Sequence, residues 1–503
     1  MQILSNNCKF WRNYFRLIGI VVILQTTAYS QGTLEMFQGG IIGADLRIGG
    51  SGLSGFSGTF DGIGGSISQL TPGGESVRWN PVGLAYIKKS LLYSEWVPPI
   101  SLDLNPVLDV EKRANDKLHQ NISDINDGSD VEQSIEDFVI KPSLGMDGGQ
   151  GNYAAIAKTR YFVIGGAVHS PSRVLADIGV SGTKFRAATN SNGGTTIRLL
   201  GILSGTMSSE IKISGYSLAL AKLFPYHIGV GVGLDDYSAT LSTIGVFQPE
   251  AQVSSGSQEF IFNNPEPTHY DKLNANTDGF FKGSGTRLRF GLGYHFKNWL
   301  AVDLAYFSPY SIEMDGTMFL DYNQILAFNT SGDNFFDAAQ LLEDDYTGTH
   351  KRTTTIHNLK FKFTGRTSIA VAGKWGQGRA SIIYESYNSL NALVYKYDSI
   401  GSDASDSTFT PISGKREIGL KPSHAFYASA GANWMQIRLG AVRADWINRH
   451  DHGSDDSSES LWLPVFGLSG GFIAPHYKQF QIDYAFTVGI TSFLRFGLSY
   501  QLQ

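Results

Sequence analysis

Residues Arg287–Tyr310, RLRFGLGYHFKNWLAVDLAYFSPY, alternate between apolar residues and small or charged ones. This period of two is that of a β-strand, whose successive side chains point to opposite faces. Lys297-Asn298 interrupts the alternation at the point where a tight turn would reverse the chain. The apolar face of the two halves reads Leu288, Phe290, Leu292, Tyr294, Phe296, Leu300, Val302, Leu304 and Tyr306. The stretch therefore predicts a β-hairpin with one apolar face and one polar face.

The alternation alone fits either a soluble β-sandwich or a transmembrane β-barrel, and the lengths of strands and connections favour the barrel. Each half runs for about ten residues, which is what a tilted strand needs to cross a bilayer. Tyr306, Phe307 and Tyr310 lie where an interfacial aromatic girdle is expected. No run of 18 apolar residues follows residue 30, so a transmembrane helix is not predicted.

Short turns alternate with long polar stretches along the chain, which is typical of outer-membrane barrels with periplasmic turns and extracellular loops. Tight turns are expected near 224–227, 375–379, 433–435 and 474–477. Extracellular loops are expected at about 98–150, 248–283, 311–355, 389–415 and 447–459. The chain ends on an amphipathic strand, Phe493–Gln503. Counting such segments predicts an all-β, antiparallel transmembrane barrel of about 14 strands over residues 86–503.

The first 30 residues have the layout of a secretory signal peptide. Lys9, Arg12 and Arg16 precede an apolar core, 17–24, and small residues at Ala28 and Ser30 suit a cleavage site. A short membrane anchor is the alternative, but this core is too short to span a bilayer. We expect cleavage near Ser30-Gln31 and an outer-membrane location. Cleavage would remove the only cysteine, Cys8, so no disulfide is expected.

The composition argues against several classes of protein. Charged residues make up 17% of the chain and the net charge is −5, which gives no basic surface for nucleic acid. Many of the 58 glycines lie in residues 39–84, before the first long strand. Because glycine permits unusual backbone angles, such a segment suits a plug inside a barrel. The alternative is a flexible periplasmic leader. We expect residues 31–85 to form a hatch.

The stretch Trp79–Ala85, WNPVGLA, followed by the strand-like Lys89–Trp96, resembles the FadL/OmpP1 family of outer-membrane transporters. It also resembles the related PorV-like barrels of type IX secretion. The family motif is Asn-Pro-Ala, and Val82 stands here where alanine is usual. The FadL resemblance implies a hatch that shifts around Asn80, Pro81, Val82 and Gly83 and a hydrophobic or amphipathic ligand such as a long-chain fatty acid.

The resemblances also imply partners. Outer-membrane lipids and, during biogenesis, the barrel-assembly machinery would contact the chain in either case. A PorV-like role would instead make 248–283 and 311–355 docking surfaces for a secreted protein. No cofactor is implied.

Charged residues on the polar faces of the predicted strands are candidates for the lining of the lumen. They could simply keep the interior hydrated and paired, or they could hold an anionic head group. The candidates are Arg287, Arg289, Asp303, Lys360, Lys362, Arg438, Arg443, Asp483 and Arg495.

Motifs of enzymes and metal sites are present only in part. Gly467–Gly471 matches G-x-S-x-G, but no helix is expected after it, as a hydrolase would require. Gly50–Gly55 matches G-x-G-x-x-G without a βαβ unit. The acidic stretch 103–137 and the His450–Asp456 segment are read as solvated loops rather than as calcium or other metal sites. We therefore predict neither catalysis nor a bound metal.

Overall fold

The computed structural model describes residues 74–78, 80–97, 100–103, 132–135, 140–146, 150–190, 196–247, 250–255, 258–262, 272–296, 299–326, 348–376, 378–388, 391–402, 412–432, 434–450, 457–473, 479–488 and 493–502. The predicted signal peptide, the first part of the predicted hatch, most of the 98–150 stretch and residues 451–456 of the 447–459 stretch lie outside these residues. None of the helices in the described residues is long and apolar enough to cross a membrane.

The described chain is almost entirely β-strand. Its helical turns are η1 (Gly74–Val77), η2 (Pro81–Tyr86) and η3 (Pro225–His227). Its strands are β1 (Leu91–Val97), β2 (Ile100–Asp103), β3 (Glu132–Ile135), β4 (Ile140–Met146), β5 (Gln150–Lys158), β6 (Val163–Asn190), β7 (Thr196–Phe224), β8 (Ile228–Phe247), β9 (Glu250–Ser255), β10 (Gln258–Phe262), β11 (Lys272–Phe296), β12 (Leu300–Phe307), β13 (Tyr310–Leu326), β14 (Gly348–Phe363), β15 (Arg366–Trp375), β16 (Gly378–Tyr387), β17 (Asn391–Ser402), β18 (Ile412–Ala432), β19 (Met435–His450), β20 (Ser457–Ile473), β21 (Phe480–Val488) and β22 (Phe493–Gln501).

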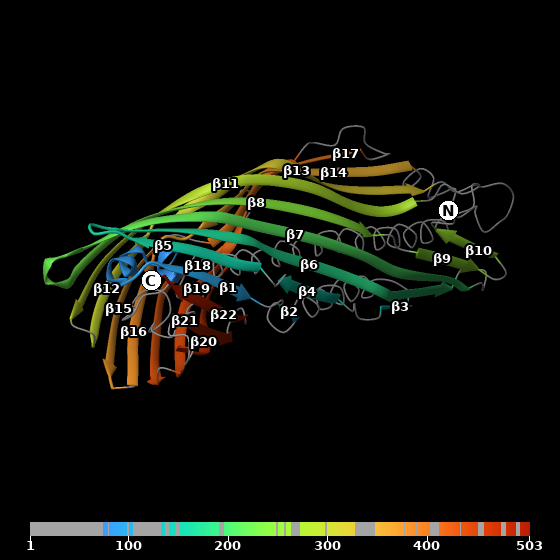
Figure 1. Cartoon of the computed structure of the whole chain (residues 1–503). Helices are drawn as coiled ribbons and strands as arrows, with labels where there is room; N and C mark the ends of the chain where they lie inside the picture. The colour runs from blue at the N-terminus through green and yellow to red at the C-terminus, as the bar shows by residue number, and fades with distance from the viewer. Residues whose placement is uncertain are drawn as a thin grey trace.

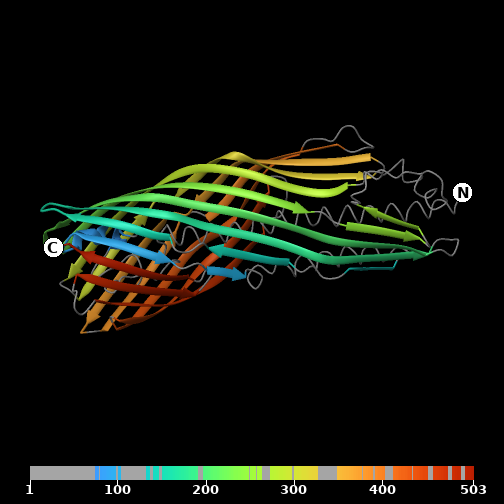
Figure 2. The ribbon, with the colours of Figure 1, turned by 45° about the vertical axis from the view of Figure 1, so that its right-hand side comes forward.

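These strands close into a barrel (Figures 1 and 2). The antiparallel pairings run β1–β5–β6–β7–β8–β11–β12–β15–β16–β18–β19–β20–β21–β22 and return from β22 to β1. Fourteen strands of the described chain therefore form the ring, as the sequence predicts. Beyond it, β13, β14 and β17 continue the wall away from β12, β15 and β16, and we call these three strands the upper wall.

The outer face of the ring is apolar. Phe290 of β11 pairs with Val232 of β8 and Tyr306 of β12, and all three side chains are exposed. Similar rows continue through Leu439 and Phe466 to Phe496 and Trp96. A closed band of exposed apolar side chains requires a lipid environment, and closure leaves no sheet edge to satisfy in that environment. The described residues therefore form a transmembrane barrel.

The short turns and the long stretches are separated along the barrel. Tight connections are present at η3, where Tyr226 and His227 have positive φ, and between Trp375 and Gly378. The turn near 433–435 is also confirmed, because Ala432 pairs with Met435. The turn at 474–477 lies outside the described residues. We call this end of the barrel the short-turn end.

All five of the predicted loops contain strand residues, so the prediction that these residues form loops was wrong. Residues 98–150 include β2, β3 and β4, and residues 447–459 include the end of β19 and the start of β20. Residues 248–283 include β9, β10 and the start of β11, residues 311–355 include β13 and the start of β14, and residues 389–415 include β17. The outer faces of β13 and β14 carry charges such as Glu313 and Lys360, with Phe319 as an exposed apolar residue among them. Because the outer face of such a strand is mostly polar, its sequence lacks the apolar alternation of a lipid-facing strand and predicts a loop instead.

Candidate functional site

Residues Gly74–Ser90, here called the inner segment, pack against the inside of the barrel wall near the short-turn end. Val77, Leu84 and Ile87 of this segment form one buried cluster with the wall residues Ile156 and Ala219 and their neighbours. Burial of these side chains removes apolar surface from water and so stabilises the docked arrangement. The predicted hatch residues Asn80, Pro81, Val82 and Gly83 all belong to this segment and are all buried.

The sequence of the motif explains its local turn. Asn80 caps η2, because its side-chain oxygen accepts a hydrogen bond from the Val82 N–H at 3.3 Å. Pro81 occupies the first helical position, where a missing N–H costs nothing. The Gly83 N–H donates to the Asn80 carbonyl at 3.0 Å and completes the turn.

Glycines of the wall allow this turn to approach closely. A Cβ on Gly231 of β8 would lie 2.4 Å from the Pro81 carbonyl carbon, and one on Gly291 of β11 would lie 2.5 Å from Asn80 Oδ1. Both distances are far shorter than a real carbon contact allows. Only glycine at these two inward positions accommodates the backbone of the inner segment where it lies.

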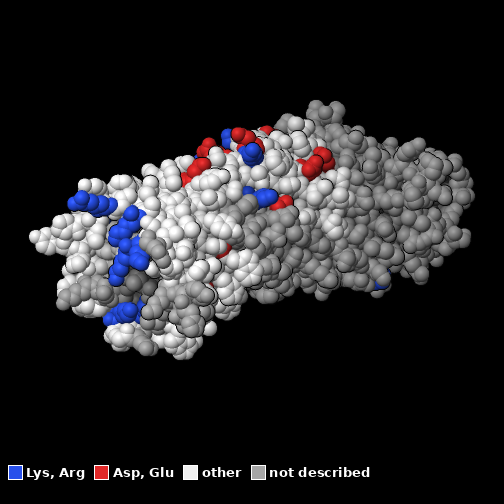
Figure 3. Space-filling model, viewed as in Figure 1, with Lys and Arg blue, Asp and Glu red and all other residues white. Residues whose placement is uncertain are grey.

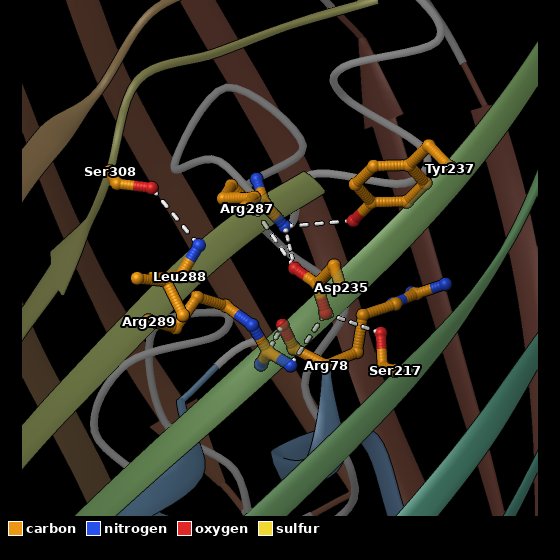
Figure 4. Close-up of polar contacts among 8 residues, drawn as sticks. All are labelled: Arg78, Ser217, Asp235, Tyr237, Arg287, Leu288, Arg289 and Ser308. Atoms are coloured by element: carbon orange, nitrogen blue, oxygen red, sulfur yellow. Dashed lines mark hydrogen bonds and ion pairs between the residues drawn. The ribbon is translucent and has the colours of Figure 1, made fainter. Parts of the chain in front are cut away.

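A buried charge cluster joins the wall to the inner segment (Figure 4). Asp235 of β8 accepts two hydrogen bonds from Arg287, at 2.9 and 2.8 Å, and one from Arg289 at 2.6 Å. Ser217 of β7 also donates to this carboxylate. Arg289 extends its other terminal nitrogen to the backbone carbonyl oxygen of Arg78. All three charged side chains are buried, so the hydrogen bonds are needed to offset their desolvation.

Two residues of the inner segment, Arg78 and Tyr86, make further contacts with the wall. Arg78 pairs with Glu95 of β1 at 3.4 Å. The Tyr86 hydroxyl donates to backbone carbonyls of the wall, at 2.7 Å to Gly293 and 3.0 Å to His227. The Tyr86 ring stacks on His295, with centroids 3.5 Å apart, and His295 in turn contacts Asp303. Polar links therefore secure the segment at both of its ends.

Aromatic side chains surround the Arg287 end of the cluster. The guanidinium carbon lies 5.6 Å from the centre of the Tyr237 ring and 5.4 Å from those of Phe307 and Tyr310. Such cation–π contacts stabilise a buried arginine. Tyr310 also stacks on Phe363 of the upper wall at 4.5 Å. The charge cluster is thus continuous with the inner face of the upper wall.

The upper wall has apolar side chains inside and charges outside, the reverse of the ring below it. Ile312, Met314, Leu359, Phe361 and Phe363 are all buried. On the opposite face, Lys360 pairs with Glu313, and Lys362 pairs with Glu417 at 2.7 Å. The Lys360 hydrogen bond lowers the pKa of Glu313. The polar outer face is suited to water, and the apolar inner face is not.

The predicted lumen residues divide into three groups. Arg287, Arg289, Asp303, Arg438 and Asp483 are buried on the inner face of the ring. The prediction that Lys360 and Lys362 line the lumen was wrong, because both lie on the outer face of the upper wall. The prediction for Arg443 was also wrong. It is an odd number of residues from the inward-facing Arg438 on the same strand, so it points to the opposite face and is exposed there. The side chain of Arg495 lies outside what the structure describes.

Several residues of the site were missed from the sequence. Asp235 is two residues after Gly233 in β8, and Gly229, Gly231 and Gly233 all face inward. The alternation of this strand therefore predicts that Asp235 also faces inward. Nothing in the sequence signals that Arg78 and Glu95 pair. Ser469 of the G-x-S-x-G match lies in β20 opposite Gln436, without the strand-to-helix turn of a hydrolase. Within the described residues, no group of three or more His, Cys, Asp or Glu could hold a metal.

No protein-family model and no curated protein sequence matches the chain. Among solved structures, it is similar to the toluene transporter TodX of Pseudomonas putida, at 11% identity and a TM-score of 0.42, over 89% of this chain and 97% of that one. It is also similar to the toluene transporter TbuX of Ralstonia pickettii, at 13% identity and a TM-score of 0.42, over 90% and 99%.

A FadL homologue of Pseudomonas aeruginosa is similar at 9% identity and a TM-score of 0.39, over 89% of this chain and 99% of that one. The likeness is thus to transporters and to a member of the family that the sequence resembles.

Proposed function

We propose that this chain is an outer-membrane channel for hydrophobic or amphipathic small molecules, with the inner segment as its hatch. The observation that carries the proposal is the apolar inner face of the upper wall. Barrels that conduct water and ions have polar interiors. Here Ile312, Phe361 and Phe363 line the inside of a wall whose outer face is charged.

An apolar interior beyond the lipid band suits a molecule that must leave water before it crosses the membrane. Transfer of apolar surface from water is favourable at roughly 25 cal/mol per Å². The aromatic residues around Arg287 lead from this wall toward the charge cluster. An amphipathic ligand would therefore meet apolar surface first and positive charge next. Long-chain fatty acids, which have this construction, are our first choice of ligand.

The inner segment is suited to gating because it is not a strand of the barrel and contacts the wall through side chains rather than through strand pairing. Its polar links to the wall include those of Arg78 with Glu95 and Arg289 and those of Tyr86 with two wall carbonyls. We propose that ligand arrival shifts the turn at Asn80–Gly83 away from Gly231 and Gly291. This movement would open the barrel at the short-turn end.

Binding of a fluorescent long-chain fatty acid to the purified barrel tests the proposal. We expect saturable binding that unlabelled fatty acid competes away, and weaker binding in Phe361→Asn. The matched control is Lys360→Gln, on the neighbouring residue but the outer face, which should bind as the unmodified chain does. Each variant is first checked for a gel shift on boiling, which reports a folded barrel. Absence of saturable binding in the folded, unmodified chain would contradict the proposal.

A PorV-like docking role is the second candidate, and the charged outer face of the upper wall and of the neighbouring strands β18 and β19 favours it. The outer face pairs Lys362 and Arg449 with the same residue, Glu417. Such a face could bind another protein in water. A docking barrel should show no competable fatty-acid binding and should co-purify with a secreted partner, so the binding measurement also separates the two functions.

A further inference from the structure

Among the described residues, the exposed charged side chains at the short-turn end of the barrel are all basic. The exposed charged residues there are Lys88, Lys89, Lys158, Arg160 and Lys222. Asp303 and Asp483, which lie near the short-turn ends of β12 and β21, are buried inside the barrel. Figure 3 shows basic residues gathered near this end of the face in view, whereas acids and bases are mixed farther along. We call the five residues the basic collar.

Three neighbouring segments bring the basic collar together. Lys158 pairs with Val163 across the β5–β6 turn, which contains Arg160. Val163 pairs in turn with Ala221, the neighbour of Lys222. Lys158 also donates from Nζ to the Ile87 carbonyl at 2.8 Å, which places the end of the inner segment, with Lys88 and Lys89, beside it. The positive charges are therefore clustered on one side of the barrel rather than scattered around its rim.

Exposed aromatic side chains accompany the bases. Arg160 lies over the Tyr161 ring at 5.7 Å, and Lys222 lies over the Phe224 ring at 5.1 Å. Tyr226, at the tip of η3, is 85% exposed. Tyrosine and other aromatic rings are enriched where lipid meets water, and long basic side chains there extend toward the head groups.

Lys222 connects the collar directly to the lipid-facing surface. It shares the outer face of β7 with Leu218 and Leu220 and pairs with the exposed Val230 of β8. A base at the end of an apolar column therefore lies at the depth of the lipid head groups. A soluble anion would account for the charge of the collar but not for its continuity with this band.

We propose that the basic collar binds the phosphate head groups of anionic phospholipids in the leaflet that meets the short turns. Juxtamembrane bases attract anionic lipid, and neighbouring bases act together. The aromatic rings bury against the acyl chains while the lysines and the arginine contact phosphate. This inference does not depend on the proposed transport function.

Spin-labelled phosphatidylglycerol and phosphatidylcholine, compared by the immobilised fraction of each around the reconstituted barrel, test the proposal. The unmodified chain should prefer phosphatidylglycerol by at least about threefold. The preference should fall close to one in the Lys88→Gln/Lys89→Gln/Arg160→Gln/Lys222→Gln variant. It should also weaken at high salt, since exposed charges are screened. Lys158 is left in place because its Nζ donates a hydrogen bond to the Ile87 carbonyl of the inner segment, whereas the side chains of Lys88 and Lys89, at the end of that segment, are exposed.

The control replaces four exposed lysines away from the collar, Lys212, Lys282, Lys396 and Lys415, with glutamine. It removes the same number of positive charges as the collar variant and should keep the preference. If the collar variant does not fold, Arg160→Gln/Lys222→Gln should still lose a measurable part of the preference. No preference in the unmodified chain, or equal loss in collar and control variants, would overturn the inference.

Discussion

Arg289 of the barrel wall donates a hydrogen bond to the backbone carbonyl oxygen of Arg78 in the inner segment. The same guanidinium binds Asp235 of the neighbouring strand at 2.6 Å. A single buried arginine therefore connects the wall to the segment inside it. Because a buried guanidinium needs its hydrogen bonds, the segment can leave only if Arg289 finds other partners.

Asp235→Asn should destabilise the folded barrel strongly. The change leaves two buried arginines without their shared carboxylate, and breaking a buried pair in this way typically costs about 3–5 kcal/mol. The measurement is the denaturant or temperature midpoint at which the unboiled protein loses its distinct gel migration. Asp236→Asn, one residue along β8 but exposed on the outer face, is the control and should change the midpoint little.

Arg289→Lys should loosen the inner segment while leaving the barrel closed. An ammonium group cannot reproduce the planar fork that reaches both Asp235 and the Arg78 carbonyl. We expect a higher basal conductance in planar bilayers than that of the unmodified chain. Arg287→Lys alters the same carboxylate from the opposite side, toward Tyr237. Equal conductance in the two variants would show that the Arg78 link does not hold the segment.

Gly231→Ala should displace the turn at Pro81. Its Cβ would overlap the Pro81 carbonyl carbon, and overpacking of this kind costs roughly 1–3 kcal/mol. We expect a lower unfolding midpoint and faster proteolysis within residues 74–90. Gly166→Ala provides the comparison, because the nearest atom to its Cβ would be 3.6 Å away. Proteolysis at the same rate in both would argue against close packing of the turn.

The Glu313–Lys360 pair should give a small, pH-dependent stabilisation. The lysine lowers the pKa of Glu313 in the folded chain, so the folded state favours the carboxylate. The contribution should be present at neutral pH and should be lost as the pH falls through the lowered, folded-state pKa. Comparing unfolding midpoints of the unmodified chain and Lys360→Met across that range measures it. A constant difference at all pH values would contradict the pairing.

The barrel itself could be predicted from the sequence because lipid imposes a simple pattern. In Leu288–Phe296 and Leu300–Tyr306, every second residue must be apolar on the outer face, and the structure has this pattern. The motif Asn80–Gly83 was singled out by its resemblance to the Asn-Pro-Ala motif of the FadL/OmpP1 family, and its role as a helix start was seen only in the structure. Its burial against Gly231 required the folded structure.

The upper wall could not be read correctly because alternation does not say which face points inward. Lys360 and Lys362 alternate with Leu359 and Phe361 as lumen residues would. Beyond the lipid band, however, the outer face meets water, so the assignment is reversed. A bulge at Asn358, with φ of 52° and a register shift, also changes the parity along β14. Partners such as Arg78 and Glu95 come together only through closure of the barrel.

The most direct test of the hatch is a reversible tether. A Cβ on Gly165 would lie 2.5 Å from Val77 Cγ2, so Val77→Cys/Gly165→Cys places two sulfurs within reach of a disulfide between wall and inner segment. A Cys8→Ser background removes the only native thiol. Fatty-acid uptake into vesicles is measured before and after reduction, with each single-cysteine variant as a control. We predict that uptake is blocked when the pair is oxidised and restored when it is reduced. Unchanged uptake through the oxidised barrel would contradict the hatch.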